Sequence, residues 1–316
     1  MFLTQFLSRH THLWKSLAVS SLGGMMSKYP KYCWIDHLRR ISLHCGKCSS
    51  TKIVLGIETS CDDTGAAVVD ETGNILGEAL HSQNEVHLKT GGIIPPVARQ
   101  LHQENIERIV QQALSLSGVC VDELSAVATT VKPGLALSLG VGLDYSLELV
   151  QKYKKPFIPI HHMEAHALTV RLTDPVEFPF LVLLLSGGHC ILAVAQGVAD
   201  FLLLGQTLDI APGDMLDKVV SGGVASNQYI RKALQIVGNA TDTNVICPPP
   251  RLCTDNGVMI AWNGIERLSA GLGIFHNTEG IRYEPKAPLG IDISDQVKEA
   301  SIRVTTLDFT SDILKY

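Results

Sequence analysis

The sequence predicts a mixed α/β protein with two lobes, because one unit of three short strands occurs twice along the chain. The first unit covers residues 53–83, where the apolar runs IVLGIETS, AAVVD and ILGEALHSQ are separated by small polar turns. The second covers residues 180–209 and reads FLVLLLSGGHC, ILAVAQG and VADFLLLGQTLD. Helical patterns lie between the two units, so each unit is expected to form a sheet covered by helices.

Two helices and two further strands are expected between the repeated units. Apolar residues recur at helical spacing in residues 97–116 and again in residues 136–153, behind a Pro-Gly turn. Residues 126–131 and 157–160 are short apolar runs typical of buried strands. Mixed lobes with a duplicated hairpin unit are typical of the actin-like, Hsp70-type superfold, which also includes sugar kinases. That fold does not by itself name a reaction.

Composition limits the possible classes of protein. The chain has 316 residues, of which 46% are hydrophobic and 18% are charged, as in a folded globular protein. The richest apolar run, residues 178–185, is much shorter than the roughly 18 residues that a membrane-spanning helix needs. We therefore expect no membrane insertion.

The first 52 residues differ in composition from the rest of the chain. They contain eight basic residues and a single acidic one, Asp36, among many Ser and Leu residues. This composition is typical of a transit peptide, and a basic tail without a targeting role is the alternative. The rest of the chain holds 18 basic and 30 acidic residues, so its overall charge does not indicate nucleic-acid binding.

A metal site is predicted from two separate segments. His162 and His166 are four residues apart, so on a helix both imidazoles project from one face. Asp255 lies at a turn before the apolar helix expected at 258–268, where it can supply a third ligand or cap the helix. The spacing does not distinguish iron from zinc.

A metalloprotease is a minor alternative, raised because two histidines at this spacing also occur in the H-E-x-x-H helix. There the glutamate directly follows the first histidine and acts as the base. Here Glu164 lies two residues after His162, roughly 200° around an ideal helix, so we expect it to point away from a metal.

Two loops of small residues, at 186–189 and 221–227, allow a nucleotide or phosphate to approach the backbone.

Seven segments in the same order together resemble the TsaD family of tRNA threonylcarbamoyltransferases, and most closely its mitochondrial branch. They are GIETSCDDT (56–64), GGIIPPVARQLHQEN (91–105), HHMEAH (161–166), LLSGGH (184–189), DMLDK (214–218), SGGVASN (221–227) and CTDNG (253–257). The resemblance extends from about residue 52 to residue 304, apart from one gap.

The resemblance implies a reaction and its site. Family members transfer the threonylcarbamoyl group of threonylcarbamoyl-AMP to N6 of the adenosine 3′ of the anticodon, in tRNAs that read codons beginning with adenine. His162, His166 and Asp255 are then implied to hold one divalent metal ion, iron or zinc, as a Lewis acid. The residues implied to border the adenylate are Leu184, Leu185, Ser186, Gly187, Gly188, Asp217 and Asn227. The implied partners are tRNA, threonylcarbamoyl-AMP and a second copy of the chain, in the mitochondrial matrix.

The chain departs from the family between Lys218 and Ser221, where relatives carry a segment of small-domain size. We therefore expect a leader at 1–52, a first lobe at 53–175, and a second lobe at 176–316 that lacks this central segment. The strands from 180 to 204 would lose cover on one face, so exposed apolar patches are expected. An inactive or unstable splice isoform or gene-model fragment is the main alternative function, ahead of an actin-like small-molecule kinase.

Overall fold

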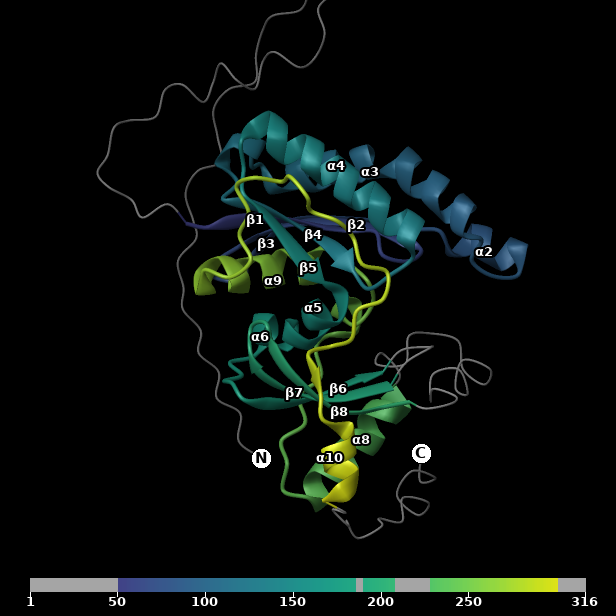
Figure 1. Cartoon of the computed structure of the whole chain (residues 1–316), viewed down its shortest axis with the longest axis vertical. Helices are drawn as coiled ribbons and strands as arrows, with labels where there is room; N and C mark the ends of the chain where they lie inside the picture. Colours follow the sequence, from purple (N-terminus) through teal and green to yellow (C-terminus); the bar gives the residue numbers. More distant parts are fainter. Residues whose placement is uncertain (1–50, 186–189, 208–227, 301–316) are drawn as a thin grey trace, which may run out of the picture. The chain divides into compact units, whose positions relative to one another are not determined.

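The computed structural model describes residues 51–185, 190–207 and 228–300, which form two β-sheets with their helices (Figure 1). Several predicted features lie outside these residues. They are the N-terminal leader up to residue 50, the junction at 218–221, and Ser186, Gly187, Gly188, Asp217 and Asn227. Among the residues that are described, no helix is long and apolar enough to cross a membrane.

The first sheet has five strands in the order β3-β2-β1-β4-β5. Their bounds are β1 (Ile53–Glu58), β2 (Asp63–Asp70), β3 (Ile75–Ser82), β4 (Ala126–Lys132) and β5 (Phe157–His161). β1, β2 and β3 are antiparallel, whereas β4 and β5 continue the sheet in parallel with β1. The three predicted hairpin strands and the two predicted single strands are therefore confirmed.

Helices cover both faces of this sheet. α3 (Pro95–Ser117) and α4 (Ala136–Tyr153) pack on one face, and α9 (Gly257–Ala270) packs on the other. Side chains alternate along β1, so Leu55 and Ile57 join the core beneath α3 and α4 while Val54 joins the core beneath α9. Gly56 allows α9 to lie close to β1, because a Cβ there would be 2.2 Å from the backbone nitrogen of Ala261.

The second sheet repeats the three-strand unit. β6 (Phe180–Leu185), β7 (Cys190–Gly197) and β8 (Asp200–Gln206) are antiparallel neighbours, and β9 (Ile291–Asp292) adds in parallel to β8. One face of this sheet packs on α5 (His162–Leu168), where Val182 and Phe201 contact a core that includes Leu168. The predicted α/β class with a duplicated strand unit is confirmed.

The opposite face of the second sheet leaves apolar side chains exposed among the described residues. Leu181 and Leu183 of β6 are 59% and 41% exposed. Their partners across the ladder, Val194 and Leu192, are only half-buried. The expectation of exposed apolar residues on these strands is confirmed.

The remaining elements are α2 (Asn84–Thr90), η1 (Val121–Glu123), α6 (Val170–Thr173), α8 (Gln228–Ala240), η3 (Pro250–Leu252) and α10 (Ser294–Glu299).

Candidate metal centre

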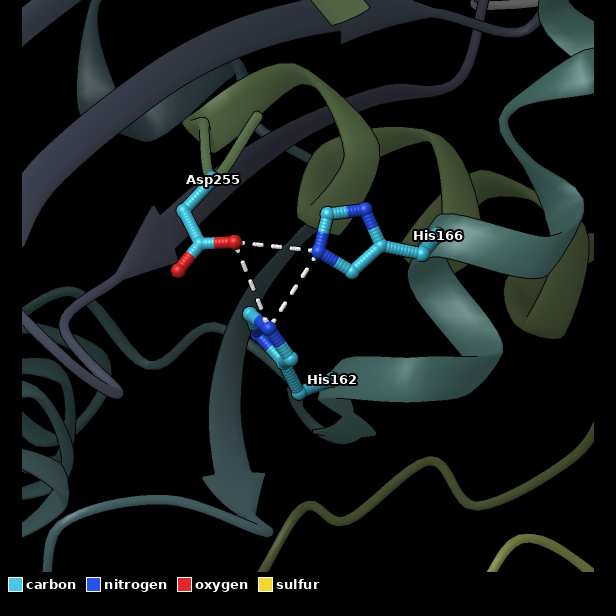
Figure 2. Close-up of side chains that lie close together, drawn as sticks. All are labelled: His162, His166 and Asp255. Atoms are coloured by element: carbon cyan, nitrogen blue, oxygen red, sulfur yellow. Dashed lines mark hydrogen bonds and ion pairs between the residues drawn. The ribbon is translucent and has the colours of Figure 1, made fainter. Parts of the chain in front are cut away.

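Two histidines are presented by α5, which begins at the residue after β5 ends. His161, the last residue of β5, is the N-cap, and its Nδ1 accepts a hydrogen bond from the Met163 backbone nitrogen at 3.2 Å. Burial lowers the pKa of His161 to about 4, so its ring is neutral and can accept this bond. His162 and His166 then follow one turn apart on the same helix face, as predicted (Figure 2).

The third side chain is that of Asp255, which lies in the turn before α9. Asn256 is the N-cap of α9, and its Oδ1 accepts a hydrogen bond from the Met259 backbone nitrogen at 2.9 Å. The alternative that Asp255 caps this helix is therefore wrong, and its carboxylate is free to face α5. Gly257 brings the turn close to β2, because a Cβ there would lie 2.4 Å from the Ala66 carbonyl carbon.

The three side chains converge on one point, as Figure 2 shows. His166 Nε2 lies 3.2 Å from His162 Nε2 and 3.0 Å from Asp255 Oδ1. His162 Nε2 lies 3.4 Å from the same oxygen. Two ligand atoms about 2.1 Å from a common ion, at roughly 90–110° to each other, are separated by about 3.0–3.4 Å. The donor triangle therefore has the size and composition of a divalent metal site with open positions.

The centre is reachable from solvent. The side chains of His162, His166 and Asp255 are 13%, 16% and 24% exposed. A metal held by three protein ligands with solvent access is the arrangement of catalytic rather than structural sites.

Glu58, the last residue of β1, lies behind His162, and the sequence analysis did not identify it. Its Oε2 is 3.2 Å from His162 Nδ1, on the side of the ring away from the donor triangle. The available signal was an acidic residue in an otherwise apolar strand, within the segment GIETS.

The charged groups of the centre shift the pKa values of one another. Burial opposes the charge on Glu58 and on Asp255, but the nearby His162 outweighs it, so the pKa of Glu58 is lowered and that of Asp255 lies well below its ordinary value. Burial also opposes the charge on His162, but Asp255 and Glu58 raise its pKa well above 6.5. Without a metal, His162 is therefore an imidazolium between two carboxylates, and a bound ion would replace one of its protons.

Glu164 takes no part in the donor triangle. Its Oε2 accepts a hydrogen bond from Arg267 Nη2 of α9 at 2.5 Å, and both side chains are almost fully buried. The expectation that Glu164 points away from the histidine pair is confirmed. A metalloprotease would need this carboxylate beside the metal, so the geometry argues against that alternative.

The predicted adenylate-binding residues are only partly within the described structure. Leu184 and Leu185 end β6, where they pair with Ile191 and Cys190 of β7. Both are half-buried. The other five predicted residues fall outside the described ranges, so their contribution to this site stays a prediction.

The fold and the donor triangle define a two-sheet α/β protein with a candidate metal centre, and comparison with known proteins gives its family. The family model TsaD, tRNA N6-adenosine threonylcarbamoyltransferase, matches residues 74–221 and 216–262. The mitochondrial enzyme of that name from Mus musculus is 50% identical over 409 aligned positions, which cover 92% of this chain and 99% of that protein. The Homo sapiens protein is 51% identical with the same coverage. The chain belongs to the TsaD family.

Among solved structures, YeaZ from Pseudomonas aeruginosa aligns with 74% of this chain and 99% of its own. The TM-score is 0.43 and the identity is 12%, so the similarity is weak. The family assignment instead confirms the predicted acyltransferase class, and the names of the close relatives confirm the predicted mitochondrial localisation.

The chain is shorter than its relatives. The alignment with the mouse protein has more positions than the 316 residues of this chain, so that protein contains residues that this chain lacks. The two segments matched by the family model meet at residues 216–221. This is the place where the sequence analysis predicts the missing segment.

Proposed function

We propose that this protein transfers the threonylcarbamoyl group from threonylcarbamoyl-AMP to N6 of the adenosine 3′ of the anticodon, in mitochondrial tRNAs that read codons beginning with adenine. The observation that carries the proposal is the donor triangle of His162, His166 and Asp255, in a chain about 50% identical to named transferases. A bound divalent ion, iron or zinc, would stabilise negative charge on the attacked carbonyl oxygen.

The proposed reaction needs little beyond positioning. The adenosine N6 amine attacks the carbonyl carbon, a C–N bond forms, the C–O bond to the phosphate breaks, and AMP leaves with that electron pair while the amine loses a proton. No covalent enzyme intermediate is required. The chain's own task is to orient the donor, and we propose that Leu184, Leu185, Ser186, Gly187, Gly188, Asp217 and Asn227 border the adenylate.

Two features support a second candidate, a catalytically inactive or unstable form of the enzyme. Leu181 and Leu183 are exposed on the second sheet, and the relatives contain residues that this chain lacks. We place the missing segment between Lys218 and Ser221, so that Asp217 and Asn227 lack the structure that separates them in longer members. A kinase of the same superfold would leave the donor triangle without a role.

The deciding experiment compares the chain with a version in which the relatives' segment is inserted between Lys218 and Ser221. Each receives threonylcarbamoyl-AMP and mitochondrial tRNA, and modified adenosine is measured by mass spectrometry of nucleosides. We expect the restored protein to be active and the shorter chain to be at least about a hundredfold slower, because small displacements of site groups cost this much.

Each outcome of this comparison bears on one claim. Equal activity of the two proteins would contradict the proposed effect of the missing segment. Inactivity of both would count against the transferase proposal. His166→Ala in the restored protein is the matched control, and it should remove the activity if the donor triangle holds the metal.

Import and assembly are further parts of the proposal. We propose that residues 1–52 direct the protein to the mitochondrial matrix, because they are basic, rich in Ser and nearly free of acidic residues. A fluorescent reporter fused behind these residues should enter mitochondria, and diffuse cytosolic signal would contradict the proposal.

The homodimer implied by family resemblance predicts a doubled mass in light scattering of the restored protein.

A further inference from the structure

Glu58 is a fully buried carboxylate at the end of β1, and the proposed function gives it no role. Buried carboxylates are costly unless they are paired and hydrogen-bonded. Its position is specific, because it lies beside His162, which follows the parallel strand β5, and beside Thr130 of the parallel strand β4. The residue therefore lies where three elements meet behind the donor triangle.

The Glu58 carboxylate has three partners. Oε1 accepts a hydrogen bond from the Ser60 backbone nitrogen at 2.5 Å, and Oε2 accepts one from Thr130 Oγ1 at 2.5 Å. Oε2 also lies 3.2 Å from His162 Nδ1. The first two contacts come from a backbone group and a fully buried side chain, so they fix the carboxylate against the imidazole.

The contact matters because only one nitrogen of His162 faces the donor triangle. Nε2 lies next to His166 and Asp255, and it can bind a cation only if it carries a lone pair. A neutral imidazole must then hold its proton on Nδ1. Whatever fixes that proton on Nδ1 prepares His162 as a ligand.

Two groups face Nδ1, and they differ in what they permit. Ser60 Oγ lies at 3.1 Å and can either donate or accept a hydrogen bond. An ionised carboxylate can only accept. Glu58 therefore selects the form with hydrogen on Nδ1, and the serine hydroxyl alone would not.

We propose that Glu58 is a positioning residue of the metal centre: it accepts the Nδ1 hydrogen of His162 and so holds the Nε2 lone pair toward the ion. The inference rests on the proposed metal centre and extends it to a residue 104 positions away in the sequence. Thr130 supports the same arrangement by donating to the carboxylate oxygen that faces the histidine.

The test is Co²⁺ binding to the 316-residue protein, followed by visible absorption without tRNA or donor. Glu58→Gln keeps the size of the side chain but offers an amide NH₂ group, so the Nδ1 hydrogen is no longer required. We expect this variant to bind Co²⁺ about 10–100-fold more weakly, the range for partners that orient metal-bound histidines.

Glu164→Gln is the matched control. It removes another buried carboxylate by the same substitution, on the helix that carries both histidines, but its partner is Arg267. We expect it to lower the thermal midpoint of the metal-free protein and to leave Co²⁺ affinity unchanged. A general effect of losing a buried charge would instead weaken binding in both variants, and that result would overturn the inference.

A second variant and a spectroscopic signature keep the test decisive if Glu58→Gln fails to fold. Thr130→Val removes one donor to Glu58 with little change of shape, and it should weaken Co²⁺ binding severalfold. In the Zn²⁺-loaded protein, ¹⁵N spectra should show a protected Nδ1–H signal that His162→Ala removes.

The outcomes separate this inference from the proposed centre. Unchanged Co²⁺ affinity in folded Glu58→Gln, or in Thr130→Val if the first variant does not fold, would overturn the role of Glu58 alone. Absence of the Nδ1–H signal in the unsubstituted Zn²⁺-loaded protein would do the same. Failure of the unsubstituted protein to bind Co²⁺ would overturn the metal centre and this inference together.

Discussion

The two sheets of this protein share a strand unit but differ in how they are covered. Each begins with three antiparallel strands, and the first sheet then gains β4 and β5 and has helices on both faces. The second sheet packs on α5 through one face and leaves Leu181 and Leu183 exposed on the other. The difference teaches that the repeated unit buries one face but not both, because a sheet with two apolar faces needs cover on each.

The interruption of the family match falls in the part of the chain that forms the less covered sheet. The family model is interrupted at 216–221, after β8 and before α8. Neither element that carries the donor triangle lies at this interruption, since α9 covers β1 and β2 while α5 packs against both α9 and the second sheet. The chain therefore retains the candidate metal centre, whereas the interruption follows β8 of the sheet that has exposed leucines.

The largest expected contrast is between core residues of the two sheets. Phe157→Ala in β5 removes a fully buried ring and should lower the free energy of unfolding by about 3–5 kcal/mol. Leu183→Ala in β6 should change it by less than about 0.5 kcal/mol, as at an exposed position. Denaturant unfolding of both variants measures the difference. Equal losses would show that Leu183 is packed in solution.

Metal binding should stabilise the protein by joining α5 to the turn before α9. Zn²⁺ at a hundred times its dissociation constant should raise the free energy of unfolding by about 2.7 kcal/mol. His166→Ala should abolish this gain together with stoichiometric metal, whereas Leu183→Ala should retain it. Thermal midpoints with and without Zn²⁺ provide the measurement. A full gain in the His166 variant would contradict the assignment of the ligands.

The pH dependence should have opposite signs for the metal-free and the metal-bound protein. The pKa of His162 is raised above 6.5, so its charge stabilises the metal-free fold below that pH, and this contribution is lost as the pH rises through the raised pKa. Metal affinity should instead rise with pH by up to about tenfold per unit, because the ion replaces that proton. Co²⁺ titrations between pH 6 and pH 8 would reveal the trend, and a flat profile would contradict it.

The smallest expected effect concerns the turn that presents Asp255. Asn256→Ala removes the N-cap of α9 and should cost about 1 kcal/mol in the free energy of unfolding. Asp255→Asn removes a ligand but leaves the cap, so it should lower metal affinity without that cost. Urea denaturation of the two metal-free variants compares them. A larger cost for the Asp255 variant would mean that its carboxylate supports the helix after all.

Local patterns predicted most of the described fold. The strands of both repeated units follow from short apolar runs between polar turns, and α4 has the predicted bounds because its apolar spacing begins directly after a Pro-Gly turn. The histidine pair was predictable for the same reason, since four residues separate neighbours on one helix face.

Contacts between distant segments were less accessible to sequence reasoning. Glu58, Thr130 and His162 come from two strands and a helix, and nothing local links a glutamate in β1 to a histidine after β5. The cap of α9 was ambiguous because Asp255 and Asn256 are both good N-cap residues. The close approach of Gly257 to β2 determines which of the two faces the histidines.

The position of α9 in the chain has a consequence for biosynthesis. The strands of the first sheet are complete at residue 161, but the helix that covers one of its faces begins only at residue 257. At a synthesis rate of about 5–20 residues per second, Asp255 and α9 are made several seconds after β5. During that time the apolar face of the sheet is uncovered and the donor triangle lacks its carboxylate. A chaperone that binds nascent apolar surface can therefore bind this face during that interval. The interval is longer in the relatives, because they contain additional residues.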